Sequence, residues 1–252
     1  MAITSRIQKE HGTDTGKGNG FGYQKKALDD GSYTMDVSGV SAVNHTGVDQ
    51  ASPFTKLADG TFMNTEVRAG SITIDSALGE AALHLQTDSA SGRLRVNDAF
   101  DAAHQTQLGD LGHLNFDFYV QSSDRSDVMP VIRLAIDADG NLATTNDRGE
   151  LVFEWAYQGF GAVPMGQWVH ADLIGADWNA WQRSNGANHD SFPDIVAFSN
   201  WSDADGYTAA GGIHFDEHSV VLGWSIAYGS GNGTGSMYLD HLQVGAATVN
   251  FA

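Results

Sequence analysis

The chain has 252 residues, with 13 Lys or Arg against 31 Asp or Glu, so its formal net charge at pH 7 is −18. This acidic excess argues against nucleic acid or an anionic membrane surface as a partner, because either would repel the chain at long range. The sequence has no run of about 18 apolar residues that could insert into a membrane as a helix. It also has no Cys, which excludes disulfides and cysteine-ligated metals.

The N-terminal part differs from the rest of the chain in charge. Residues 1–56 contain six basic and six acidic side chains and are neutral, so the remaining residues carry the whole net charge of −18. Residues 5–26 show almost no apolar periodicity, which is typical of a solvated tail. We therefore expect an N-terminal arm over residues 1–26 and a single β-sandwich domain over residues 27–252. No apolar segment of the kind that directs secretion is visible at the start of the sequence.

From about residue 31, apolar and polar residues alternate with a period of two, as in half-buried β-strands. Gly is abundant (30 residues) and Asp outnumbers Glu by 25 to 6, a composition that favours turns over helices. Only residues 99–108 and 177–183 could hold one or two helical turns. These features predict an all-β fold, a two-sheet antiparallel sandwich of the jelly-roll or lectin-like kind, with one wet face on each strand. The expected strands cover residues 32–40, 71–75, 81–86, 93–97, 114–120, 131–136, 151–155, 168–173, 220–228, 237–244 and 248–251.

One loop has the spacing of a Ca²⁺ site. Asp137, Asp139 and Asn141 place side-chain oxygens at alternate positions, with Gly140 where the chain turns, and Asp147 could supply a further oxygen. The alternative is a hairpin turn in which Asp oxygens accept backbone N–H groups. Asp203 and Asp205, followed by Gly206, repeat the two Asp and the Gly of this motif but lack a third oxygen ligand at residue 207.

An aromatic-rich segment between the strands near residues 170 and 196 suggests sugar binding. Exposed indoles stack on the apolar face of a sugar, while amides, carboxylates and guanidinium groups bind its hydroxyls. The alternative is that these rings pack beneath a long loop, as large Trp side chains usually do. If a glycan binds, the negative field of the chain favours a neutral one unless Arg183 or a bound Ca²⁺ offsets that field locally. The candidate ligand-binding residues are Trp178, Trp181, Arg183, Asn185, Asp190 and Trp201.

Signals for catalysis are few. Glu154 and Asp172 both fall in expected strands, and two carboxylates about 5–9 Å apart would serve a glycosidase. Nothing in the sequence indicates that these two side chains face each other. A non-catalytic module is therefore the preferred interpretation, and Glu154 and Asp172 are the candidates if the chain is an enzyme.

Segments over residues 114–119, 133–137, 151–159, 166–168, 181–183, 221–224, 229–231, 238–240 and 249–251 resemble, in order, the motifs of one family. The family is the β-sandwich domains of exported bacterial proteins, many of them sorted by exosortase (PEP-CTERM proteins) and others part of large calcium-binding surface proteins. The resemblance covers roughly residues 70–252 and implies a fold and a bacterial cell-surface location rather than a reaction. Residues 238–240, in the strand expected at 237–244, are also similar to a strand of jelly-roll carbohydrate-binding modules. This resemblance implies Asp240 as a structural Ca²⁺ ligand.

Together these observations predict a non-catalytic extracellular module that binds a polysaccharide or cell-surface glycan, or acts as an adhesin, with structural Ca²⁺. A second hypothesis is a structural subunit of a filament or surface layer, which self-associates when the arm pairs with the sheet edge of a neighbour. A third is a polysaccharide-active enzyme on the same fold. A β-sandwich hosts all three functions, so the fold alone does not choose between them.

Overall fold

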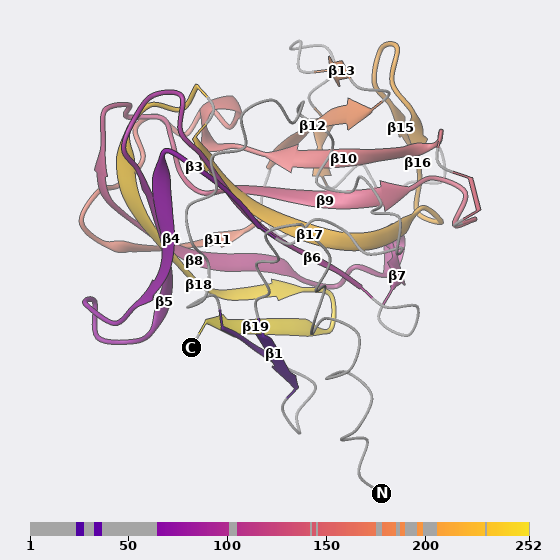
Figure 1. The fold of residues 1–252 in the computed structure, drawn as a ribbon. Helices are drawn as coiled ribbons and strands as arrows, with labels where there is room; N and C mark the ends of the chain where they lie inside the picture. The colour runs from indigo at the N-terminus through magenta and orange to yellow at the C-terminus, as the bar shows by residue number, and fades with distance from the viewer. Residues whose placement is uncertain are drawn as a thin grey trace, which may run out of the picture.

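The computed structural model describes residues 24–27, 33–36, 65–100, 105–141, 143–144, 146–174, 178–184, 187–189, 196–198, 206–229 and 231–251. In these residues two β-sheets pack face to face with the main hydrophobic core between them (Figure 1). The predicted all-β antiparallel sandwich is confirmed. Within the described ranges, no helix has the length and hydropathy needed to cross a membrane.

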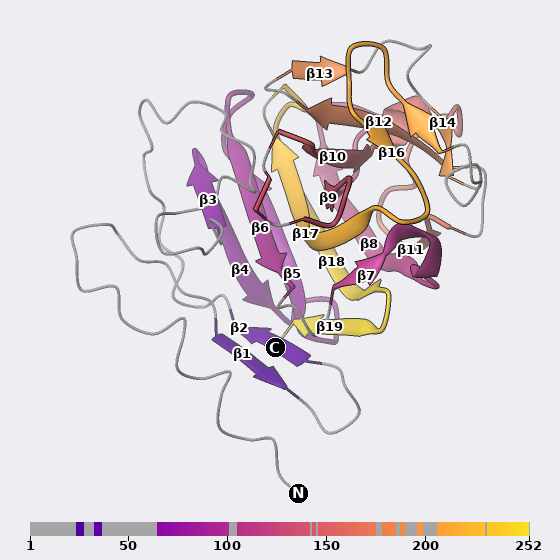
Figure 2. The ribbon, with the colours of Figure 1, turned by 90° about the vertical axis from the view of Figure 1, so that its right-hand side faces the viewer.

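The first sheet has eight strands in the order β1-β2-β19-β18-β5-β4, and β18 also pairs with β8, which pairs with β11. All pairs are antiparallel except β2 with β19. Figure 2 shows β1 and β2 beside β19 at one edge of the sandwich. The strands are β1 (Gln24–Ala27), β2 (Tyr33–Asp36), β4 (Gly70–Asp75), β5 (Ala82–Thr87), β8 (Leu114–Ser123), β11 (Trp168–Asp172), β18 (Gly235–Val244) and β19 (Ala247–Phe251).

The second sheet has nine strands in the order β13-β12-β10-β9-β17-β6-β3, with β14 beside β12 and β7 beside β17. A separate hairpin joins β15 (Tyr207–Thr208) to β16 (His214–Phe215). Two 3-10 turns, η2 (Leu108–Asp110) and η3 (Trp155–Tyr157), complete the described elements. The strands of this sheet are β3 (Thr65–Arg68), β6 (Arg93–Ala99), β7 (Thr106–Gln107), β9 (Val131–Asp137), β10 (Arg148–Phe153), β12 (Asn179–Ser184), β13 (Ala187–His189), β14 (Val196–Ala197) and β17 (Val220–Gly229).

The alternation seen in the sequence places the core. Leu114, Phe116 and Phe118 of β8 are buried, and the residues between them are partly exposed. The expectation of one wet face per strand is wrong for β17, whose residues between its two ends are all buried. On its outer face Leu222 packs against Ala135, and Ala227 belongs to a separate small apolar cluster on the nine-stranded sheet. The cluster consists of Val131, Val152, Trp181 and Ala227, with Tyr157 packed against it.

The helical turn considered over residues 177–183 is wrong, because β12 occupies Asn179–Ser184. Ala180 joins the main core, whereas Trp181 joins the cluster on the outer face of the sheet. On the side of β12 that holds Ala180, the next residues are Gln182 and Ser184, which are polar but buried, so the sequence lacks the alternation that reveals a strand. The other segment for which helical turns were considered is residues 99–108. Its described part contains β7 and the start of the single turn η2, and residues 101–104 lie outside the described ranges.

Trp178 belongs to the main core and not to an exposed sugar-binding surface, since it is only 4% exposed. Its ring lies edge-on to Phe160 at 5.3 Å and to Trp155 at 6.0 Å between ring centroids. Trp178 is therefore a packed ring, as in the second interpretation of this segment, and not an exposed sugar-binding ring.

We expect Trp178→Ala to lower the free energy of unfolding by about 3–5 kcal/mol, because it removes a large buried ring and leaves a cavity. Trp168→Ala is the matched control: Trp168 is 40% exposed, and its loss should cost about 1 kcal/mol. Urea unfolding of both variants, with unchanged m-values, measures the difference. Similar midpoints for the two variants would contradict the placement of Trp178 in the core.

Candidate functional site

The outer face of the nine-stranded sheet brings together residues that are far apart in sequence. Opposite residues in neighbouring strands point to the same face of a sheet. Trp181 of β12 lies opposite Val152 of β10, which lies opposite Arg133 of β9. In a neighbouring row, Arg95 of β6 lies opposite Ala227 of β17. The site is therefore built by strand register, with one or two side chains from each strand.

These residues surround a pocket of about 220 Å³, which we call the arginine pocket. Four of the eight arginines in the chain line it, although the chain as a whole is strongly acidic. The residues that line it are Arg93, Arg95, Val131, Arg133, Glu154, Tyr157, Trp181, Arg183, Asn188, Ala227, Tyr228, Gly229 and Asn232.

Contacts within the protein hold Trp181 and Arg133 in place. The guanidinium carbon of Arg133 lies 5.9 Å from the centroid of the Trp181 ring, a cation–π contact. Nη1 of Arg133 donates to Oε2 of the buried Glu150 at 2.9 Å. Nε1 of Trp181 donates to Oε2 of Glu154 at 2.9 Å. Trp181 is only 6% exposed, so it forms the floor of the pocket and not a free stacking surface.

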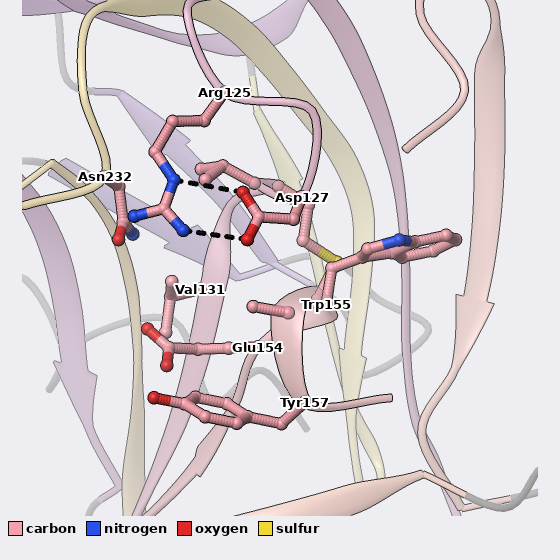
Figure 3. Close-up of a pocket in the computed structure, with 10 residues that line it drawn as sticks. Arg125, Asp127, Val131, Glu154, Trp155, Tyr157 and Asn232 are labelled. Atoms are coloured by element: carbon pink, nitrogen blue, oxygen red, sulfur yellow. Dashed lines mark hydrogen bonds and ion pairs between the residues drawn. The ribbon is translucent and has the colours of Figure 1, made fainter. Parts of the chain in front are cut away.

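A smaller pocket adjoins the arginine pocket and shares Val131, Glu154, Tyr157 and Asn232 with it (Figure 3). Arg125 and Asp127 form a two-pronged ion pair across it, with N–O distances of 3.0 and 2.8 Å. The hydrogen bonds from Arg125 lower the pKa of Asp127. In Figure 3 the Glu154 carboxylate and the Tyr157 hydroxyl lie side by side, while the Trp155 indole points away from them.

Of the predicted ligand-binding residues, the structure brings Trp181 and Arg183 together in the arginine pocket. Asn185, Asp190 and Trp201 lie outside the described residues. The possible catalytic pair is not assembled: Glu154 lines the arginine pocket, whereas Asp172 lies on β11 of the opposite sheet. There Oδ1 of Asp172 accepts the backbone N–H of Ile174 at 3.2 Å. The alternating sequence pattern predicted a strand at each residue, but it did not indicate which sheet each strand joins.

The predicted metal loop follows β9, and its carboxylates converge. One oxygen each from Asp137, Asp139 and Asp147 lies within 4.8 Å of the others. Asp137 is fully buried; its Oδ2 accepts from Nε of Arg148 at 2.8 Å, but its Oδ1 has no hydrogen-bond partner. Both carboxylate oxygens of Asp147 are also buried without a partner. Burial raises the pKa of Asp137, and the negative charges of Asp147 and Asp139 act in the same direction.

The turn hydrogen bonds of the alternative interpretation are present in the same loop. Oδ1 of Asp139 accepts the backbone N–H of Asn141 at 2.7 Å, and Oδ1 of Asn141 accepts that of Ala143 at 3.2 Å. Gly140 has a φ of +67°, a conformation that favours glycine. The loop is therefore a hydrogen-bonded turn that also gathers carboxylates. Asp203 and Asp205 lie outside the described residues.

Asp240 and His241 of β18 lie near Glu80 in the loop between β4 and β5, with one possible ligand atom of each within 4.8 Å of the others. Burial raises the pKa of Asp240. Nδ1 of His241 lies 2.9 Å from Oδ2 of Asp117, so this ring already has a carboxylate partner. A histidine in the group suits Ca²⁺ less well than oxygen ligands alone. The assignment of Asp240 as a metal ligand stays a prediction.

A second aromatic surface lies on the outer face of the eight-stranded sheet. Trp168, Tyr119, Tyr238 and His84 form a row across four strands. Tyr238 is 2% exposed and stacks on His84 at 4.3 Å, and Tyr119 lies edge-on to both Tyr238 and Trp168. Trp168 is therefore the most open ring of this row.

Sequence reasoning missed Arg93, Arg95 and Arg133. Arg93 and Arg95 are alternate residues of a predicted strand, so the sequence did show that both point to one face. It did not show that β17 and β9 lie beside that strand, because strand order is not encoded in local alternation.

Two solved structures are similar in fold. The family 11 carbohydrate-binding module from Clostridium thermocellum, in complex with a β-1,3-1,4-mixed-linked tetrasaccharide, matches 73% of this chain and 89% of its own, with 11% identity and a TM-score of 0.40. A family 30 carbohydrate-binding module matches 72% of this chain and 90% of its own, with 11% identity and a TM-score of 0.38. Neither a family model nor a curated protein matches the sequence. The resemblance to exported surface proteins therefore stays a prediction.

We expect Glu150→Gln to lower the free energy of unfolding by about 3 kcal/mol, because it removes the buried carboxylate that pairs with Arg133. Glu80→Gln removes the same charge from a side chain that is 79% exposed, and should cost less than about 1 kcal/mol. Chemical denaturation at pH 7 compares the two. Equal costs would show that the buried pair contributes nothing beyond the change in net charge.

Proposed function

We propose that the chain is a non-catalytic glycan-binding module of an extracellular surface or matrix, and that the arginine pocket is its binding site. The observation that carries this proposal is the convergence of planar polar side chains around one aromatic-floored pocket on an outer sheet face. Sugar hydroxyls are bound by such groups, since each can donate or accept hydrogen bonds in a fixed plane.

The individual side chains suit this role. Asn188 and Asn232 offer amides, and Glu154 offers a carboxylate that already accepts one hydrogen bond from Trp181. Tyr157 is partly exposed and presents both a ring and a hydroxyl to the shared wall of the two pockets. Because Trp181 is buried, Tyr157 is the ring that can pack against a sugar.

Binding is favoured over hydrolysis by the carboxylates near the pocket. A glycosidase places two carboxyl groups on either side of the scissile bond. Among the described residues that line the arginine pocket, Glu154 is the only acid. In the adjoining pocket Asp127 is held in the ion pair with Arg125. Release of reducing ends from a bound polysaccharide would support the enzyme hypothesis instead.

The self-assembly hypothesis stays a prediction. It depends on residues 1–26, of which Gln24, Lys25 and Lys26 are described as part of β1. Their pairing with β2 places this end of the segment at the edge of the eight-stranded sheet. Light scattering of the full chain and of a chain lacking residues 1–23 tests the hypothesis, which requires the full chain to be larger than a monomer.

We expect a glycan array to give a ligand whose affinity falls about tenfold in Tyr157→Ala, since one aromatic–sugar contact is worth on the order of 1–2 kcal/mol. Asn188→Ala, at an exposed position, should weaken binding to a smaller extent. Trp168→Ala, on the opposite sheet, is the matched control and should bind as the wild type does. Calorimetric titration measures all three. Loss of binding in Trp168→Ala alone would place the site on the aromatic row of the opposite sheet.

We also propose that the loop after β9 binds a structural Ca²⁺. The support is the unpartnered Oδ1 of the fully buried Asp137, together with the two buried oxygens of Asp147. Buried carboxylate oxygens without a hydrogen-bond donor are costly unless a cation occupies the space between them. Asp139 would add a further oxygen from the same loop.

We expect Ca²⁺ to raise the thermal unfolding midpoint relative to chelator, by the equivalent of about 2.7 kcal/mol at a hundredfold excess over Kd. The pKa of Asp137 is raised by burial, so without the ion its ionisation destabilises the folded state as pH rises through that pKa. The Ca²⁺-induced shift should therefore be small near pH 4 and full at pH 7.

Asp147→Asn removes no protein hydrogen bond, so this variant should fold without Ca²⁺ at least as well as the wild type and lose the Ca²⁺-induced shift. Asp88→Asn changes the net charge equally at an exposed site and should keep the shift. Identical wild-type midpoints in Ca²⁺ and in chelator at pH 7 would rule the site out.

A further inference from the structure

We propose that the arginine pocket recognises the anionic groups, carboxylate or sulfate, of an acidic polysaccharide. This inference rests on the proposed glycan-binding function and names the class of glycan. It departs from the neutral ligand that the net charge of the chain favours.

The first argument is the concentration of positive charge. The chain has a net charge of −18, yet half of its eight arginines line a single pocket. Among the described lining residues one carboxylate, Glu154, accompanies them, and Glu150 lies behind Arg133. The local sign of the pocket is therefore opposite to that of the molecule, which is the condition under which an anion can bind there.

The second argument is the cost of this arrangement. Arg95 is 4% exposed and Arg93 is 9% exposed, so both guanidinium groups have lost most of their water. Bringing several like charges out of water in one place destabilises a fold unless negative groups compensate them. Both groups also interact with other groups of the chain, and an anionic ligand adds to that compensation, whereas a neutral one adds none.

The third argument is the shape of the pocket. β17 lies between β6 and β9, and on the outer face it carries the small residues Ser225 and Ala227, followed by Gly229. Ala227 and Gly229 lie opposite Arg95 and Arg93 on one side, and Ser225 lies opposite Arg133 on the other. Neighbouring strands are about 4.8 Å apart, so the two sides are separated by roughly 10 Å. The small side chains leave a trough with arginines along both walls.

The fourth argument is the donor capacity of the guanidinium groups. Arg133 uses Nη1 for Glu150, while its buried Nε has no hydrogen-bond partner. Arg93, Arg95 and Arg183 also interact with other groups of the chain. Each guanidinium has five N–H donors, so an internal contact leaves donors for a ligand. The planar fork of arginine matches a carboxylate or a sulfate with two parallel hydrogen bonds.

An acidic polysaccharide fits this pocket better than a nucleic acid does. Duplex DNA carries one charge per about 1.7 Å, whereas a uronic acid polymer carries at most one carboxylate per sugar. Repulsion from the acidic body therefore weighs less on the polysaccharide, and at physiological salt it is screened beyond about 8 Å. A pocket of about 220 Å³ also suits a substituted sugar ring rather than a duplex.

The test uses the full chain and matched probes in calorimetric titration: oligogalacturonate, its neutral methyl ester and a sulfated oligosaccharide. We expect the oligogalacturonate or the sulfated probe to bind at least about tenfold more tightly than the ester. Tighter binding of the oligogalacturonate identifies carboxylates as the recognised groups, and tighter binding of the sulfated oligosaccharide identifies sulfates. Equal or tighter binding of the ester overturns this inference and leaves the glycan-binding function standing.

A glycan array extends the comparison beyond these probes. If none of the three binds, array ligands that are anionic support the inference and array ligands that are all neutral overturn it. An array without any ligand overturns both the inference and the proposed function.

A pair of variants with the same change in net charge isolates the local contact. Arg183→Gln should weaken binding of the anionic ligand about tenfold, whereas Gln86→Glu, at an exposed position on β5 of the opposite sheet, should leave it unchanged. Equal weakening by both variants would attribute the effect to net charge and overturn recognition in the pocket. If Arg183→Gln fails to fold, as judged by its unfolding midpoint, Arg93→Gln replaces it with the same expected result.

Discussion

The alternation of side chains along each strand is the constraint on which both the core and the candidate site depend. β17 shows this most clearly, because it lies at the centre of the nine-stranded sheet. Trp224, Ile226 and Tyr228 point into the core. Ser225 and Ala227, between them, point outwards and leave space between the arginines of β6 and β9. A shift of one residue in register would exchange these two sets and remove the core and the pocket together.

The outer face of the same sheet holds charges that a sandwich does not need for its stability. Arg133 is held by Glu150, and Asp137 is held by Arg148, so these two buried charges each have a partner of opposite sign. Paired charges of this kind contribute little to stability relative to apolar residues of similar size. Their concentration on one face, around a pocket, is better explained by binding than by folding.

Local alternation was enough to predict β5, β6, β8, β9, β17 and β18, and with them the sandwich. It was not enough for β12, where Ala180 and Trp181 are both buried on opposite faces and no polar residue separates them. The metal loop could be proposed from sequence because its ligands lie within a few residues of one another. The pocket could not, because Arg95, Arg133 and Arg183 meet only through the order of five strands. For the same reason the sequence did not indicate that β10, which Glu154 follows, and β11, which Asp172 ends, belong to different sheets.

The hairpin of β9 and β10 connects the two proposed sites. Asp137 ends β9 opposite Arg148, which begins β10, and Arg133 lies on the same face four residue pairs further along the hairpin, opposite Val152. Ca²⁺ bound at the loop end of this hairpin would reduce the repulsion between Asp137 and Asp147 and hold the register that sets Arg133 beside Glu150. The metal would then act on the glycan site through strand pairing, without touching the ligand. In this proposed arrangement an acidic chain would use one cation to order a hairpin, and that hairpin would present an arginine on a positively charged face.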